Sequence, residues 1–154
     1  MDDPGDYLRT VVRVFPDYAD TVLWFASGPV DYEDAGVSDD LGHAMMSWER
    51  AWYDGVTDDL HFSSVEIARE LGTEGLRLAT WLSAELGDSF EVEVLLEETG
   101  VGNQRLSGTG PGSNPNAVAA FRRMAAEDKA EQDWIQARIA EGATFTLVAG
   151  APEG

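Results

Sequence analysis

The stretch "EGLRLATWLSAELGDSFEVEV" (residues 74–94) contains the end of a helix, a stop and the start of a strand. Its first part repeats apolar residues every three or four positions as far as Leu86, which predicts one buried helix face. Gly87 then ends the helix. Beyond it, apolar residues alternate with Glu91 and Glu93, which predicts a half-buried strand with an acidic outer face. A helix that leads directly into such a strand indicates an α+β fold.

The start of this helix carries a local capping pattern. We predict Ser63 as the N-cap, and Glu66, three residues later, completes a capping box. Phe62 and Ile67 have the spacing of a hydrophobic staple around that cap. Gly75 falls on the buried face, so we expect another backbone to approach the helix closely there.

A second helix is predicted over residues 39–54. Ser38 is its expected N-cap, and Gly55 has the position of a left-handed stop. Steps of four, three and four residues place a stripe of large apolar side chains on its inner face: Leu41, Met45, Trp48 and Trp52.

The other segments complete the expected fold. We predict a β-hairpin from 7–15 and 21–26, a Gly-rich flexible loop at 99–116, a helix that opens with Asn114 and Pro115, and a last strand at 144–150. This order predicts a single α+β domain over residues 1–154. It would have a small, mainly antiparallel sheet of about four strands, packed with three helices.

Charge is the outstanding compositional feature. The chain has 29 acidic residues against 10 Lys and Arg, a formal net charge of −19. Such a surface repels nucleic acid and anionic membranes, whereas it attracts basic proteins. Cysteine is absent, no apolar run reaches the ~20 residues of a membrane span, and the start "MDDPGDY" is acidic. We therefore expect a cytoplasmic monomer or weak homodimer with no nucleic-acid or membrane partner.

The acidic stretch "GPVDYEDAGVSDDL" (residues 28–41) partly matches the ligand spacing of a calcium-binding loop. A loop that begins at Asp31 has Ala35 at its fifth position and Gly42 at its twelfth, so the bidentate ligand is missing. We expect no metal site. The two acids that follow Ser38 are explained by the first turn of the helix, where the positive end of the dipole favours anions.

Two acidic loops at opposite ends of the 39–54 helix are the candidate partner-binding site. A helix of about 15 residues separates its two ends by roughly 22 Å, so we expect the two acidic loops to form two poles of one surface. We expect each pole to carry an exposed tyrosine as a packing residue, and the alternative is that both loops are merely solvated. The predicted residues are Asp31, Tyr32, Glu33, Asp34, Tyr53, Asp54, Asp58 and Asp59.

The sequence contains no recognised catalytic or cofactor-binding motif. His43 and His61 are the only histidines, no G-x-S-x-G elbow exists, and the Gly-rich segment lacks the lysine of a phosphate-binding loop. We expect no catalytic residue and no cofactor. Asp128 interrupts the apolar face of the last helix, so it is either exposed to solvent or paired with Arg13, Arg77 or Arg122. A small-ligand site or enzyme that uses Asp128 or His61 remains an alternative.

Several short stretches resemble a known class of proteins. They are "LW" at 23–24, "GPVD" at 28–31, "VSDDL" at 37–41, "SWERAWYDG" at 47–55 and the 74–94 stretch. Together, over residues 20–96, they resemble small acidic bacterial proteins found beside secreted polymorphic toxins, where the acidic partner is often an immunity protein. The resemblance implies a non-catalytic inhibitor that binds a basic toxin and blocks its active site. An acidic nucleic-acid mimic that blocks a DNA-binding protein is the alternative.

Overall fold

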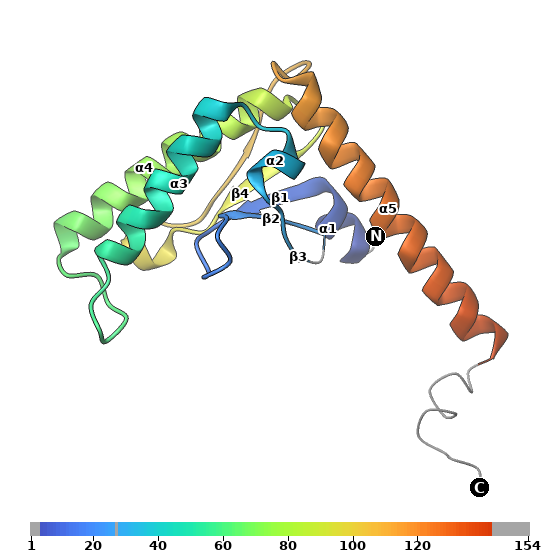
Figure 1. The fold of residues 1–154 in the computed structure, drawn as a ribbon, viewed down its shortest axis with the longest axis horizontal. Helices are drawn as coiled ribbons and strands as arrows, with labels where there is room; N and C mark the ends of the chain where they lie inside the picture. Colours follow the sequence, from blue (N-terminus) through green and yellow to red (C-terminus); the bar gives the residue numbers. More distant parts are fainter. Residues whose placement is uncertain (1–3, 27, 143–154) are drawn as a thin grey trace, which may run out of the picture.

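The computed structural model describes residues 4–26 and 28–142. One mixed sheet is packed against helices, as Figure 1 shows. Along the chain the elements are α1 Pro4–Thr10, β1 Val11–Val14, β2 Leu23–Phe25, β3 Gly28–Pro29, α2 Tyr32–Ala35, α3 Asp39–Asp54, α4 Val65–Leu86, β4 Glu91–Val94, η1 Glu97–Thr99, β5 Gln104–Ser107 and α5 Pro115–Glu141.

The sheet has five strands in the order β3-β2-β1-β4-β5. Three of its pairings are antiparallel, and β1 pairs with β4 in parallel. The predicted alternation in β4 is confirmed, because Val92 and Val94 are fully buried while Glu91 is exposed. On the outer face Arg105 of β5 pairs with Glu91 and Glu93. The α+β class and the mainly antiparallel sheet are confirmed, with five strands instead of about four.

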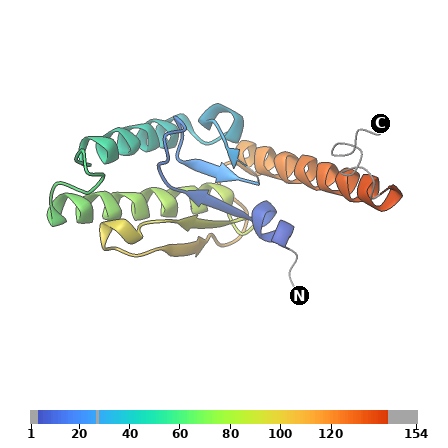
Figure 2. The ribbon, with the colours of Figure 1, turned by 90° about the horizontal axis from the view of Figure 1, so that it is seen from below.

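Helices α3 and α4 lie side by side over one face of this sheet (Figures 1 and 2). The predicted inner stripe of α3, from Leu41 to Trp52, is buried. Trp48 also donates its indole N–H to the carbonyl of Leu71 on α4, at 2.8 Å. Gly75 of α4 faces Trp48 closely enough that a Cβ there would lie 2.6 Å from the tryptophan ring. The close approach predicted at Gly75 is therefore real, but side chains make it rather than a backbone.

A buried carboxylate joins the starts of two helices. Ser38 caps α3 and Asn114 caps α5, as predicted. Glu85 of α4, only 4% exposed, accepts from the backbone N–H of Ser38 at 3.0 Å and from its hydroxyl at 2.5 Å. It also accepts from the side-chain amide of Asn114 at 2.9 Å. One side chain thus holds both N-caps against the end of α4.

Three sequence predictions about local structure are wrong. Gly55 is right-handed, with φ −85°, and a Cβ there would lie 3.0 Å from the side chain of Ile67 on α4. The N-cap of α4 is Ser64, whose hydroxyl accepts from the N–H of Ile67, because Ser63 is tied to the preceding loop through the carbonyl of Gly55. Residues 7–10 belong to α1, not to a strand, and α1 packs on α5.

The Gly-rich segment 99–116 is not a continuous loop. Residues Gln104–Ser107 form β5, an edge strand whose pairing with β4 the irregular sequence did not reveal. Flexibility of the remainder stays a prediction. The strand predicted at 144–150 lies outside the described residues. No helix among the described residues is long and apolar enough to span a membrane.

Candidate partner-binding site

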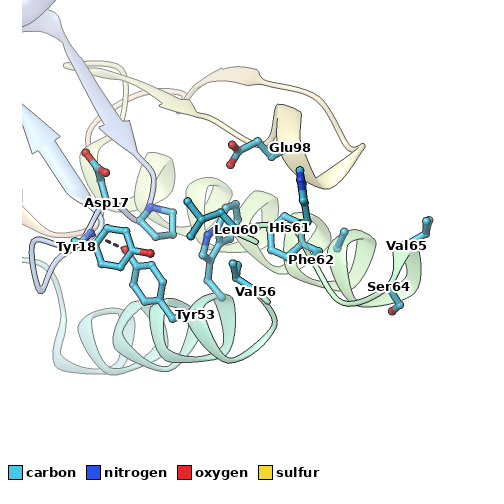
Figure 3. A pocket seen from close by; sticks show the side chains of 13 residues that line it. Asp17, Tyr18, Tyr53, Val56, Leu60, His61, Phe62, Ser64, Val65 and Glu98 are labelled. Carbon is cyan, nitrogen blue, oxygen red and sulfur yellow. Dashed lines mark hydrogen bonds between the residues drawn. The ribbon is translucent and has the colours of Figure 1, made fainter. Parts of the chain in front are cut away.

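A groove of about 630 Å³ lies between the loop that joins β1 to β2 and the loop that joins α3 to α4 (Figure 3). Its floor is aromatic. Trp52 is 7% exposed and meets Phe62 edge to face, with ring centroids 5.0 Å apart. We call it the aromatic groove; it is lined by Pro16, Asp17, Tyr18, Trp52, Tyr53, Val56, Leu60, His61, Phe62, Ser64, Val65, Ala68 and Glu98.

One wall of the groove is anchored to α3 by two tyrosines. The rings of Tyr18 and Tyr53 stack with centroids 4.6 Å apart, and Tyr53 Oη accepts from the backbone N–H of Tyr18 at 2.6 Å (Figure 3). Tyr18 itself adopts a left-handed backbone, with φ +56°, and Asp20 does so too, with φ +61°. A non-glycine residue in this region costs of order 1–3 kcal/mol, so tertiary contacts must hold the loop in this shape.

The other wall is a tight, hydrogen-bonded loop. The N–H of Thr57 donates to the carbonyl of His61 at 2.6 Å, and the N–H of Leu60 donates to the carbonyl of Thr57 at 2.8 Å. Val56 and Phe62 form an isolated antiparallel bridge at its base. Leu60 is left-handed, with φ +65°, and its side chain is 73% exposed. The loop therefore presents an apolar side chain to solvent on a fixed backbone.

The aromatic groove continues along the outer side of α3. A second hollow, of about 610 Å³, shares Tyr18 and Tyr53 with it and also contains Asp20, Met46, Glu49, Arg50 and Asp54. A third, of about 260 Å³, shares Met46 with the second and contains Tyr32, Glu33, Val37, Ser38, Asp39, Gly42 and His43. We call the three hollows together the α3 band. It connects the two predicted poles along one side of the molecule.

The α3 band is strongly acidic. Among the described residues, the only Lys or Arg that lines it is Arg50. The carboxylates that line it are Asp17, Asp20, Glu33, Asp39, Glu49, Asp54 and Glu98. Partial burial, and secondarily the charge of Asp20, raise the pKa of Glu49. The ionised form of Glu49 is therefore disfavoured mainly by burial and additionally by the neighbouring carboxylate of Asp20.

Tyr32 is not the exposed aromatic that the sequence predicted. Its ring is half-buried, and its hydroxyl accepts from the backbone N–H of Val22 at 3.0 Å. Burial raises the pKa of Tyr32 to about 12. Asp31, Glu33 and Asp34 are exposed around it, in the one-turn helix α2 and its cap instead of a loop. Tyr32 therefore fixes α2 to the sheet, and its part in binding stays a prediction.

The predicted residues at the other pole are placed more favourably. Tyr53 is half-buried, not exposed as predicted, but it lines the α3 band together with the exposed Asp54 at the end of α3. Asp58 and Asp59 are exposed on the loop that carries Leu60, beside the groove but outside its lining. The structure thus gathers Tyr53, Asp54, Asp58 and Asp59 at one end of α3 and the residues from Asp31 to Asp34 at the other. Their assignment to partner binding stays a prediction.

Sequence reasoning missed the apolar part of this site. Tyr18, Leu60 and Val65 are 75%, 73% and 72% exposed, the highest values among the large hydrophobic side chains that the structure describes, and all three line the aromatic groove. Leu60 offered one indication, because it is an isolated apolar residue in the polar loop "GVTDDLHF" (55–62) with no periodic partner. The placement of Tyr18 beside Tyr53 depends on tertiary structure and left no sequence pattern.

The alternative site residues have other surroundings. Asp128 forms an ion pair with Arg9 at 3.2 Å, and the two side chains are 13% and 9% exposed. Asp128 is therefore paired with an arginine and not exposed to solvent. The partner, however, is Arg9 on α1, and none of the three predicted arginines, Arg13, Arg77 and Arg122. His61 is exposed in the aromatic groove. Within residues 4–26 and 28–142, no three His, Asp or Glu side chains form a group that would hold a metal ion.

Comparison with known proteins gives one family. No curated protein matches the chain. The family described as Serratia CdiI immunity protein-like matches residues 10–97. This segment contains β1 to β4, α3, α4 and all of the α3 band except Glu98, whereas β5 and α5 lie beyond it. The match spans more than half of the chain, and the chain therefore belongs to the Serratia CdiI immunity protein-like family.

Proposed function

We propose that this protein is a non-catalytic immunity protein that neutralises a basic bacterial toxin by docking the α3 band over the toxin's active site. Its family supports the immunity role and a toxin as partner. The observation that carries the proposal is the α3 band itself, a continuous surface in which carboxylates surround apolar hollows. Inhibition by steric cover needs no reaction on the part of the inhibitor.

Charge supports a basic partner. A net charge of −19 attracts a cationic toxin at long range, and the carboxylates of the α3 band orient the encounter. Electrostatic steering raises association rates to ~10⁸ M⁻¹s⁻¹ or above at low salt. The α3 band fits a nucleic-acid mimic less well. Aromatic and aliphatic side chains lie between its carboxylates, whereas a nucleic-acid backbone presents rows of phosphates without apolar groups between them.

The test uses the purified chain and the toxin domain encoded beside its gene. Inhibition of the toxin and association kinetics are measured for the wild type and for a neutralised band variant, Asp20→Asn with Glu49→Gln and Asp54→Asn. The matched control, Glu127→Gln with Glu131→Gln and Glu141→Gln, removes the same charge from exposed positions of α5. We expect the band variant to associate at least ~10-fold more slowly at low salt and the control to stay near wild type. Equal effects of the two variants would place the interface elsewhere, and absence of inhibition by the wild type would end the proposal.

A further inference from the structure

The aromatic groove gathers several exposed apolar side chains around one hollow. Tyr18, Leu60 and Val65 have the highest exposure of the large hydrophobic side chains that the structure describes, and they surround one hollow. Figure 3 shows Tyr18 with Tyr53 at one end of the groove, Val65 at the other and Leu60 between them. Exposed apolar side chains gathered around a concave surface mark an interaction site, whereas scattered single ones need no explanation.

Two of these side chains, Tyr18 and Leu60, project from a backbone conformation that tyrosine and leucine disfavour. Three of the four non-glycine residues with positive φ in the described chain are Tyr18, Asp20 and Leu60, all on the two loops that form the groove. Leucine and tyrosine rarely adopt this region, and such outliers gather at binding and catalytic sites. The stack of Tyr18 on Tyr53 and the hydrogen bonds from Thr57 to His61 keep the loops in this shape without a partner present. The groove is therefore preorganised.

The floor and rim define what the groove accepts. Trp52 and Phe62 present an aromatic base whose rings are locked edge to face, which suits a large apolar side chain. Asp17 and Glu98 line the same groove, and Asp58 and Asp59 are exposed next to Leu60. An apolar side chain with a neighbouring cation matches this chemistry. A second copy of the chain does not, because each copy carries a net charge of −19.

We propose that the aromatic groove receives a large apolar side chain from a loop of the toxin, flanked by Lys or Arg that meet Asp17 and Glu98. This inference rests on the proposed function and assigns different kinetic roles to two parts of the α3 band. The carboxylates along α3 set the association rate, whereas the aromatic groove sets the lifetime of the complex. A few desolvated anchor residues carry most of the binding energy in protein interfaces, and most affinity differences appear in the dissociation rate.

The test is the variant Leu60→Asn in complex with the toxin domain encoded beside this gene. Asparagine tolerates the left-handed region better than leucine, so the variant removes the apolar side chain without straining the loop. We expect a melting temperature equal to or above that of the wild type, an unchanged dependence of association on salt, and dissociation about 30-fold faster or more. Val65→Ser should also accelerate dissociation. The matched controls are Trp134→Ser and Ile139→Ser, which remove exposed apolar side chains from α5, at 59% and 46% exposure.

The outcomes separate the two proposals. Toxin binding that is unaffected by Leu60→Asn and Val65→Ser would overturn the anchor and leave the immunity role standing. Equal acceleration by the α5 controls would overturn it in the same way. A wild type that neither binds nor inhibits the toxin would overturn both. If sedimentation shows self-association that Leu60→Asn abolishes, the occupant is a second copy and the toxin anchor is wrong.

Discussion

Tyr53 holds Tyr18 in place by two contacts at once, a ring stack at 4.6 Å and a hydrogen bond from the Tyr18 backbone N–H to the Tyr53 hydroxyl. The pair joins the β1–β2 loop to α3, and it lies where the aromatic groove meets the rest of the α3 band. The shape of the candidate interface therefore depends on a side chain that the sequence places on α3 and on a turn residue 35 positions earlier.

The hydroxyl of Tyr53 can be removed while the stack is kept. For Tyr53→Phe we expect the free energy of unfolding to fall by about 0.5–1.5 kcal/mol, because one net hydrogen bond is lost. Amide exchange at Tyr18 should accelerate, whereas the Val22 amide, which donates to Tyr32, should keep its rate. Hydrogen exchange followed by NMR measures both sites in one experiment. Unchanged exchange at Tyr18 would show that the stack alone holds the loop.

Glu85 should be far more important for stability than for binding. Glu85→Ala leaves the Ser38 backbone N–H and the Asn114 amide without their buried acceptor, so we expect a loss of about 2–3 kcal/mol in the free energy of unfolding. The control Asp88→Ala removes an exposed acid just past the end of α4 and should stay within about 0.5 kcal/mol of wild type. Urea denaturation distinguishes the two. Similar small losses in both variants would contradict the joint capping role.

Gly75 permits the close packing of α4 on α3. A Cβ at this position would lie 2.6 Å from Trp48 Cζ2 and 2.8 Å from Leu96 Cδ2. Gly75→Ala should destabilise the protein by about 1–3 kcal/mol through overpacking, although alanine is the better helix former by about 1 kcal/mol. Thr73→Ala, on the exposed side of the same helix, should be neutral or slightly stabilising. Thermal unfolding compares them, and a more stable Gly75→Ala would refute the packing argument.

Glu49 gives the stability a pH dependence of known sign. Its pKa is raised in the folded state by partial burial and then by Asp20, so its ionisation opposes folding. The folded state binds more protons than the unfolded state between the ordinary and the raised pKa, and stability from this group falls as pH rises through that window. Glu49→Gln should therefore be more stable than wild type at neutral pH, by up to about 0.5 kcal/mol as for other surface changes. The gain should vanish in acid below the ordinary glutamate pKa; a gain that persists there would point to another cause.

The sequence predicted the local elements well where side-chain periodicity alone decides them. The bounds of α3, its inner stripe from Leu41 to Trp52 and its Ser38 cap follow from three- and four-residue spacing. Residues 7–10 were mispredicted because their β-branched and aromatic composition gives way to the packing of α1 on α5. β5 was missed because an edge strand needs only one partner and little apolar pattern.

For the candidate site, the acidic composition predicted where the carboxylates cluster, but it did not predict the shape of the surface that carries them. Tyr32 was expected to be exposed because its neighbours are acids, yet its ring is drawn inward to the Val22 N–H. Leu60 and Tyr18 were not predicted as site residues, since only the folded backbone shows that their side chains flank one groove. No sequence pattern indicated a role for Glu85, because that role depends on two caps that are distant in sequence.

The most direct measurement of the central claim is hydrogen–deuterium exchange of the chain with and without the toxin domain encoded beside its gene. If the α3 band is the interface, complex formation slows exchange in peptides that cover residues 16–21 and 46–65, while the exposed half of α5 keeps its free rate. Protection confined to α5 or to the outer face of the sheet, with residues 16–21 and 46–65 unchanged, would contradict the account.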